Sequence, residues 1–396
     1  MTTRLYYFAL TALLVAGSGS LKAQGLLSLK NRGDFKDPAP VTYSAGMGVG
    51  YDTLNYKSSQ AGDIDSAFLQ GSLGATFHHK DQISPWNLGL DFGSIYYLDD
   101  TNRSSSTDYS ARVVFDVAHA ISERLKLVDN FYLTYEVEPN FGIGASTASR
   151  NGQYFYGYNN FAVSYAWSER FSTTSSYTVD GIKYEDSDIG DAEDRMSHLL
   201  SQQFSWVWTK TLKLVGEYRF RTVSYRRADS DFTSHFVLAG VDKAWSERTT
   251  GSFRGGAEFY SSKRTDKTAP YAEVSINHAT SEKSSVQLFA SAGFDGSELG
   301  SYDSRYSYRV GANGNYQVTK RLSLNSGLNY AYSVFDGSGS NADVHEHELS
   351  ANAGLGYRLW DNVTMDANYS YTILASDDNQ RDYDRNRISL GINASF

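Results

Sequence analysis

The last ten residues, Arg387–Phe396, read RISLGINASF, and this stretch decides the fold. Side chains alternate between the two faces of an extended strand. One face would carry only apolar side chains, and the other would carry the remaining, mostly polar residues: Ile388, Leu390, Ile392, Ala394 and Phe396 against Arg387, Ser389, Gly391, Asn393 and Ser395. A final strand of this kind must pair with chain that is already folded. It is either the closing strand of a membrane barrel, with lipid on its apolar face, or the last strand of a soluble sandwich.

The opposite end of the chain predicts export. Arg4 precedes an apolar run, Leu5–Val15, and small residues then lead to Leu21-Lys22-Ala23. These are the three regions of a secretory signal peptide, residues 1–23, with cleavage expected after Ala23. The apolar run is too short to span a bilayer as a helix. Residues 24–40 are expected to form an unstructured leader, either in the periplasm or inside the lumen, and residues 41–396 to form the folded domain.

Composition narrows the class. The chain has 14% aromatic residues, 34 Gly and only 5 Pro, which suits many strands and turns. It has no Cys, which excludes disulfides and a lipid anchor on cysteine. Without Arg4 and Lys22 the 36 basic residues fall to 34 against 45 acidic ones, a net charge of about −11, so nucleic acid is not an expected partner. The low mean hydropathy is compatible with a barrel, because only alternate residues meet lipid.

A repeat of about 40 residues sets the strand count. Eight short polar turns recur, centred on residues 80, 123, 169, 210, 247, 282, 320 and 361, and several read Ser-Glu-Arg. Nine longer connections separate the hairpins that these turns close, near 57–63, 99–107, 138–152, 184–195, 227–230, 263–268, 298–303, 337–345 and 377–384. Eight turns join sixteen strands, and one further strand at each end gives 18, with 16 as the alternative. An even number places both ends of the barrel sequence on the same side.

Strand length and aromatic placement favour a membrane barrel over a sandwich. Alternating runs such as Leu125–Val137 and Val363–Ile373 span about 11 to 13 residues, enough for a tilted strand to cross a bilayer, whereas ordinary strands average about five or six. All six tryptophans lie near short turns, and tyrosine pairs collect at the far strand ends. Aromatic belts at both strand ends are typical of membrane interfaces. The residues concerned are Trp86, Trp167, Trp206, Trp208, Trp245, Trp360, Tyr96-Tyr97, Tyr154 and Tyr156, Tyr306 and Tyr308, Tyr330 and Tyr332, and Tyr369 and Tyr371.

The signal peptide, the 18 expected strands, the Ser-Glu-Arg turns and the terminal Phe396 together resemble the β-barrel porins of bacterial outer membranes. The pattern is similar in particular to a group of outer-membrane barrels often met near exopolysaccharide gene clusters. The resemblance covers Val41 to Phe396, and no motif in it is specific enough to transfer functional residues. It implies a transmembrane antiparallel up-and-down barrel in the outer membrane, with loops outside and both termini in the periplasm. It also implies that Phe396 acts as an assembly signal for the barrel-assembly machinery, and that lipopolysaccharide and outer-membrane lipids surround the wall.

The expected function is a water-filled channel for small hydrophilic solutes, because a barrel of this size encloses a channel unless something fills it. The longer connections 138–152 and 184–195 could fold inward and narrow it. Rings of charged side chains set ionic preference in pores; alternatively, such residues pair across strands and stiffen the wall. A conduit for exopolysaccharide export and a structural or adhesive barrel are the other hypotheses. The candidate pore-lining residues are Arg112, Glu136, Glu217, Arg219, Arg221, Arg254, Glu258, Glu273, Arg305, Arg309 and Arg358.

Neither an enzyme, a cofactor nor a metal site is predicted. The sequence contains no Gly-x-Ser-x-Gly and no His-Glu-x-x-His motif. His345 and His347 would share one strand face, but two ligands at a loop edge rarely make a metal site. The acidic run Glu185–Asp191 lacks the full ligand spacing and closing Glu of a calcium loop. Both segments are therefore expected to be plain surface loops.

Overall fold

The computed structural model describes residues 40–57, 63–99, 106–137, 152–226, 230–295, 302–337, 342–377 and 381–396. The expected signal peptide, the leader up to residue 39 and most of the connection 138–152 lie outside these ranges. No helix in the described ranges is long and apolar enough to cross a membrane.

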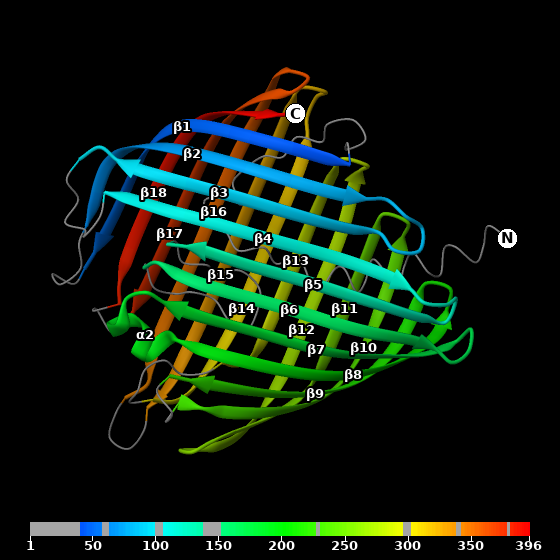
Figure 1. Ribbon diagram of the computed structural model, residues 1–396. Helices are drawn as coiled ribbons and strands as arrows, with labels where there is room; N and C mark the ends of the chain where they lie inside the picture. Colours follow the sequence, from blue (N-terminus) through cyan, green and yellow to red (C-terminus); the bar gives the residue numbers. More distant parts are fainter. Residues whose placement is uncertain are drawn as a thin grey trace.

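Eighteen antiparallel strands form one sheet that closes on itself, because β1 pairs with both β2 and β18 (Figure 1). Every other strand pairs with its neighbours in sequence. The predicted all-β up-and-down barrel of 18 strands is thus confirmed. The strands are β1 (Val41–Tyr56), β2 (Ile64–His79), β3 (Trp86–Tyr97), β4 (Thr107–Ala120), β5 (Leu125–Glu136), β6 (Tyr154–Ala166), β7 (Phe171–Tyr184), β8 (Arg195–Thr209), β9 (Leu212–Tyr225), β10 (Phe232–Ser246), β11 (Thr249–Ser262), β12 (Asp266–Ser281), β13 (Ser284–Asp295), β14 (Tyr302–Gln317), β15 (Leu322–Gly337), β16 (Val344–Trp360), β17 (Val363–Ser376) and β18 (Tyr383–Ser395).

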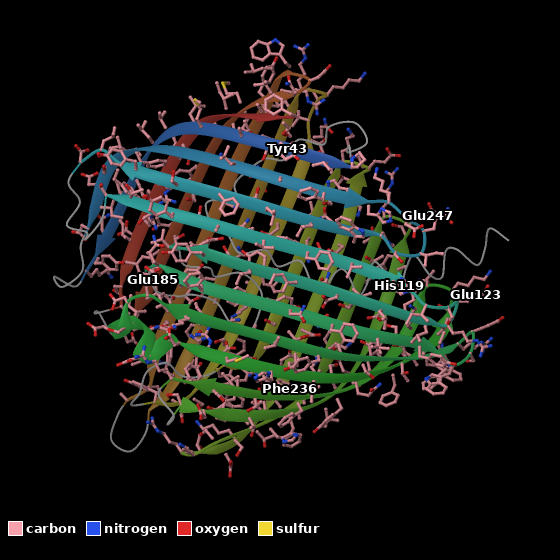
Figure 2. The ribbon with its side chains drawn as sticks, in the orientation of Figure 1. Tyr43, His119, Glu123, Glu185, Phe236 and Glu247 are labelled. Atoms are coloured by element: carbon pink, nitrogen blue, oxygen red, sulfur yellow. The ribbon has the colours of Figure 1, made fainter. Side chains whose placement is uncertain are left out.

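The eight short turns lie at one end of the barrel, here called the turn end. The strand ends that flank the longer connections lie at the other end, here called the loop end. Figure 2 shows Glu123 and Glu247 of two short turns at the turn end and Glu185 at the loop end. The recurring Ser or Thr of the turns has a structural reason. Ser122 Oγ accepts hydrogen bonds from the backbone N–H groups of Arg124 and Leu125 at 3.2 and 3.0 Å. Thr319 does the same for Arg321 and Leu322 at 3.1 and 3.0 Å, so each hydroxyl holds its turn closed.

The last strand follows the predicted alternation. Ile388, Leu390 and Ile392 are 59%, 50% and 47% exposed on the outer face, whereas Arg387 and Ser389 are buried on the inner face. The β1–β18 pairing that closes the barrel runs from Ser44 and Ser395 at the turn end to Tyr56 and Tyr383 at the loop end. Between Gly46 and Asp52 this pairing brings an apolar outer surface, including Met47, Val49 and Ile388, together with a polar inner surface.

The aromatic belts need one correction. Five tryptophans are strongly exposed on the outer surface at the turn end (Trp167, Trp206, Trp208, Trp245 and Trp360), and the outer-face tyrosines at the loop end include Tyr96 and Tyr308. Tyr97, Tyr154 and Tyr156, however, were assigned to the loop-end belt and instead face inward. Tyr97 and Tyr154 are each only 1% exposed, and Tyr156 packs against the inner cluster that contains Tyr154. Strand parity, which places Tyr97 on the same face as buried Asp91, decides the side of each ring.

The carboxyl terminus makes its backbone contacts with β1. Phe396 donates from its N–H to Tyr43 O at 2.8 Å, and its carbonyl accepts from Tyr43 N–H at 3.0 Å. Its ring is 70% exposed on the outside. The ring therefore adds little to packing within the folded chain, which is consistent with a role during assembly.

We predict that Phe396→Ala lowers the amount of folded barrel recovered from cells but leaves the stability of the purified, folded protein within about 0.5 kcal/mol of wild type. The backbone pairing with Tyr43 is retained and little buried surface is lost. Heat-modifiable electrophoretic mobility measures the folded fraction, and urea unfolding in detergent measures stability. Ser395→Ala is the control; equal yields for both variants would rule out Phe396 as an assembly signal.

Candidate functional site

The candidate site is the interior of the barrel. A cavity of about 500 Å³ lies inside it, between strands β4–β9 on one side and β10–β14 on the other. Its wall mixes tyrosine and phenylalanine rings with hydroxyl, amide and charged side chains. The lining includes Tyr132, Tyr156, Tyr158, Phe236, Tyr271, Phe289, Asn130, Asn160, Ser176, Thr178, Ser201, Gln287, Ser307, Asp116, Asp180, Glu217, Glu273, Asp295, Arg219, Arg221 and Arg309.

Arg219 on β9 is the centre of the charge network in this cavity. Its Nε lies 2.6 Å from Glu217 Oε1 on the same strand, and its Nη2 lies 2.7 Å from Glu273 Oε1 on β12. Tyr271 donates to Glu273 Oε2 at 2.7 Å, and Arg219 Nη1 donates to the Tyr271 hydroxyl at 3.2 Å. Arg254 on β11 approaches the other side of Glu217 at 3.5 Å. The curvature of the wall brings together side chains that are three strands apart.

Two further groups continue the network toward the loop end. Arg221 lies 3.3 Å from Glu258, whose side chain is completely buried. On the neighbouring strands β13 and β14, Asp295 lies 2.7 Å from Arg309 and 3.7 Å from Arg305. Charge-assisted bonds of this kind fix the side chains against the wall.

Ten of the eleven candidate residues lie in four ion-paired groups inside the barrel. The groups are Arg112 with Glu136, Arg219 and Arg254 with Glu217 and Glu273, Arg221 with Glu258, and Arg305 and Arg309 with Asp295. Arg358 lies apart from them, half-buried on β16 near the turn end. Five candidates, Glu217, Arg219, Arg221, Glu273 and Arg309, line the main cavity.

Sequence reasoning missed a buried charge cluster where the first and last strands meet. Asp52 of β1 is completely buried and lies 2.6 Å from both Arg385 and Arg387 of β18. Tyr97 of β3 donates to the same carboxylate oxygen at 2.8 Å. The signal was present in the sequence, because Arg385 and Arg387 share the polar face of the final strand. Only closure of the barrel, which sets Asp52 opposite Arg387, supplies their partner.

Apolar side chains gather in three clusters at the loop end of the lumen. These buried clusters face inward, and we call them together the apolar collar. They contain Leu54, Ile64, Phe68, Ile95, Tyr97, Leu374 and Tyr383; Val223, Tyr225, Phe232, Tyr260 and Phe294; and Tyr154, Ile182 and Tyr184. The collar therefore brings rings and aliphatic side chains to the loop-end mouth, where they lie beside buried ion pairs such as Arg381–Glu346 and Arg305–Asp295.

The acidic connection after β7 is a short helix and not the plain loop that was expected. Helix α2 (Ser187–Glu193) begins at Asp186, whose side chain accepts a hydrogen bond from Asp188 N–H. Ile189 packs against the collar residues Tyr154 and Tyr184. Asp194, which follows the helix, accepts a hydrogen bond from Tyr184 N–H at 2.7 Å. Capping and this apolar anchor explain the local order.

His345 and His347 lie on strand β16 rather than in a loop. They stack against Tyr332 and Tyr330, whose hydroxyl oxygens lie 2.8 Å from the histidine Nδ1 atoms. Among the described residues, no group of three or more His, Asp and Glu side chains could hold a metal ion.

Residues 218–396 match the model of a family described as "Putative beta-barrel porin 2". This match runs from β9 to the last strand and confirms, over those residues, the resemblance to outer-membrane β-barrel porins. No curated protein sequence matches the chain.

Several solved structures are similar in fold. OccAB4 of Acinetobacter baumannii is 12% identical, with 92% of this chain and 100% of that chain covered and a TM-score of 0.46. A BenF-like porin of Pseudomonas fluorescens Pf-5 is 10% identical, with 91% and 100% covered and a TM-score of 0.45. OpdK of Pseudomonas aeruginosa, solved with vanillate, is 9% identical, with 90% and 99% covered and a TM-score of 0.44.

We predict that Asp52→Asn destabilises the folded barrel by about 3–5 kcal/mol, because it leaves Arg385 and Arg387 buried without their carboxylate. Urea unfolding of the purified protein in detergent measures the loss. Asp361→Asn, in the exposed turn between β16 and β17, is the matched control and should change stability by less than about 0.5 kcal/mol. Equal stability of the two variants would contradict a structural role for the Asp52 cluster.

Proposed function

We propose that this porin-like barrel is a passive channel through which small hydrophilic solutes cross the bacterial outer membrane. In this proposal the short turns and both ends of the barrel face the periplasm, and the longer connections face outward. Outer-membrane lipids and lipopolysaccharide surround the apolar outer face, and the barrel-assembly machinery inserts the chain.

The cavity of about 500 Å³ inside the closed barrel is the observation that supports this proposal. Its hydroxyl, amide and ion-paired side chains can exchange hydrogen bonds with a passing solute. Because each guanidinium group that lines the cavity is paired with a carboxylate, a solute meets polar surface with only a small excess of negative charge. Weak binding of this kind lets a solute leave as readily as it enters.

The size of the cavity favours small solutes over a polymer. Side chains from facing walls reduce the lumen, and the apolar collar lies at its loop-end mouth. A sugar or small acid of drug-like size fits a pocket of a few hundred Å³. Export of an exopolysaccharide chain needs a wider, continuous path, and nothing in the described lumen favours it.

We predict a measurable conductance for the purified full-length protein in a planar bilayer. Tyr158→Ala, which shortens a side chain in the cavity wall, is expected to raise that conductance. Tyr158→Trp should lower it. Phe92→Ala is the control, because Phe92 lies 57% exposed on the outer face of β3. A folded protein that conducts no ions, or a conductance unaffected by both Tyr158 variants, would refute passage through this cavity.

We also predict a modest preference for cations. The cavity is lined by five carboxylates and three guanidinium groups: Asp116, Asp180, Glu217, Glu273 and Asp295 against Arg219, Arg221 and Arg309. The reversal potential under a KCl gradient measures this preference. Asp116→Asn keeps the shape of the side chain and its contact with Asn130 while removing a charge, so it should reduce the cation preference. The turn variant Asp361→Asn should leave it unchanged, and an anion-selective wild type would contradict the prediction.

A further inference from the structure

The hydrogen-bond ladder of the barrel is interrupted between β12 and β13. Their register ends at Ala272 and Ala292. Beyond that pair, the described residues Asp266–Tyr271 of β12 pair only with β11, and Gly293–Asp295 of β13 pair only with β14. We call the loop-end gap between these two half-strands the lateral seam.

Pro270 explains why the ladder stops. Continuing the register by two residues beyond Ala272 and Ala292 would set Pro270 opposite Phe294. Proline has no N–H, so the Phe294 carbonyl would find no donor there. Pro270 is the only proline inside a described strand of this barrel.

Side chains satisfy the backbone groups of Phe294 and Pro270 that the ladder leaves unpaired. The Phe294 N–H donates to Glu258 Oε2 at 2.8 Å, and its carbonyl accepts from Arg221 Nη2 at 2.5 Å. The Pro270 carbonyl accepts from the Tyr306 hydroxyl at 2.6 Å. Unsatisfied backbone groups are costly within a membrane, and here none of these three is left without a partner. The interruption is therefore an ordered part of the barrel wall and not a frayed strand end.

The ring of Phe294 fills the seam. Its side chain is 7% exposed. It contacts Tyr260 of the apolar collar with ring centroids 5.0 Å apart, and on its other side Tyr306 at 5.2 Å with the rings nearly perpendicular. Tyr260 belongs to the inner face of β11, whereas Tyr306 shares the outer face of β14 with the exposed Tyr308.

The main cavity reaches the same place. Gly293 and Phe294 are both part of its lining. A Cβ atom at position 293 would lie 2.8 Å from the ring of Tyr271, so glycine is needed where that ring covers the strand. Phe294 therefore both lines the lumen cavity and contacts Tyr306 of the outer face.

We propose that the lateral seam is a portal through which uncharged, ring-bearing apolar solutes pass between the lumen cavity and the bilayer, with Phe294 as its plug. The opening that Phe294 fills is one ring wide and is bounded by the rings of Tyr260 and Tyr306. Inside the cavity, Tyr271 and Phe236 lie edge to face 5.0 Å apart and provide further aromatic surface. The charges at the seam, Arg221 and Glu258, are paired, which favours a neutral solute. This function goes beyond passage of hydrophilic solutes along the lumen and rests only on the barrel lying in a membrane.

Uptake of N-phenyl-1-naphthylamine by cells that express the full-length protein tests the portal, because this neutral aromatic probe fluoresces once it enters the membrane interior. Wild type should take up the probe faster than cells without the protein, and Phe294→Ala should give a several-fold faster uptake. Pro270→Val restores the N–H that the ladder lacks and should slow uptake below wild type. Heat-modifiable mobility of each variant confirms that the barrel is folded and present in equal amount.

Phe253→Ala is the matched control, because Phe253 lies on the outer face of β11 where both neighbouring ladders are complete. It should take up the probe at the wild-type rate. Swelling of vesicles in arabinose measures hydrophilic passage separately and should be alike in all four proteins. If cells with folded Phe294→Ala and cells with folded Pro270→Val both take up the probe at the wild-type rate, the portal proposal is wrong, even where arabinose passes. If uptake follows the seam variants while arabinose does not pass, the portal stands and the hydrophilic channel fails.

Discussion

Satisfaction of backbone hydrogen bonds within hydrocarbon is the constraint on which this structure depends. A strand edge cannot be left open to lipid, since no water is present to accept or donate the missing bonds. The first and last strands must therefore meet, and β1 and β18 pair from the turn end to the loop end. In the closed barrel every strand has an outer face, which meets lipid, and an inner face, which meets the lumen. The ion-paired arginine and carboxylate side chains described above therefore lie on the inner face.

Confinement explains why the inner charges form pairs. A buried guanidinium group loses its hydration, and only a nearby carboxylate compensates for that loss. Around the wall these pairs join strands that are not neighbours, as Arg219 of β9 and Glu273 of β12 illustrate. The Asp52 cluster joins the strands on both sides of the closure, because Arg385 and Arg387 belong to β18 and Tyr97 to β3. The same side chains that give the lumen its polarity therefore also hold the barrel in shape.

Much of this architecture was predictable because the period of two and the repeated turns are local signals. The number of turns fixes the number of strands, and parity assigns all eleven candidate charges to the inner face, Arg358 with its buried register partner Thr364 included. Partner choice across the lumen was not predictable, since it depends on wall curvature and closure: Glu273 meets Arg219 three strands away, and Asp52 meets Arg385 and Arg387 only where the barrel closes. Tyrosine suits a membrane interface and a lumen equally, so residue type alone assigned Tyr97 and Tyr154 to the wrong face. Helix α2 depends on Ile189 reaching the collar, which no local pattern specifies.

The interruption at Pro270 shows how far the backbone constraint can be relaxed. The loss of the backbone pairing between residues 270 and 294 is tolerated because Glu258, Arg221 and Tyr306 offer a donor or acceptor at each vacated position. Two of these three side chains, Glu258 and Arg221, face the lumen. They can replace the missing backbone partners only because the inner charge network reaches the backbone of β13. A barrel with a purely apolar interior could not interrupt its ladder in this way. The polar lumen is therefore a precondition for a lateral opening, and the position of the opening follows from where an ion pair and a proline meet.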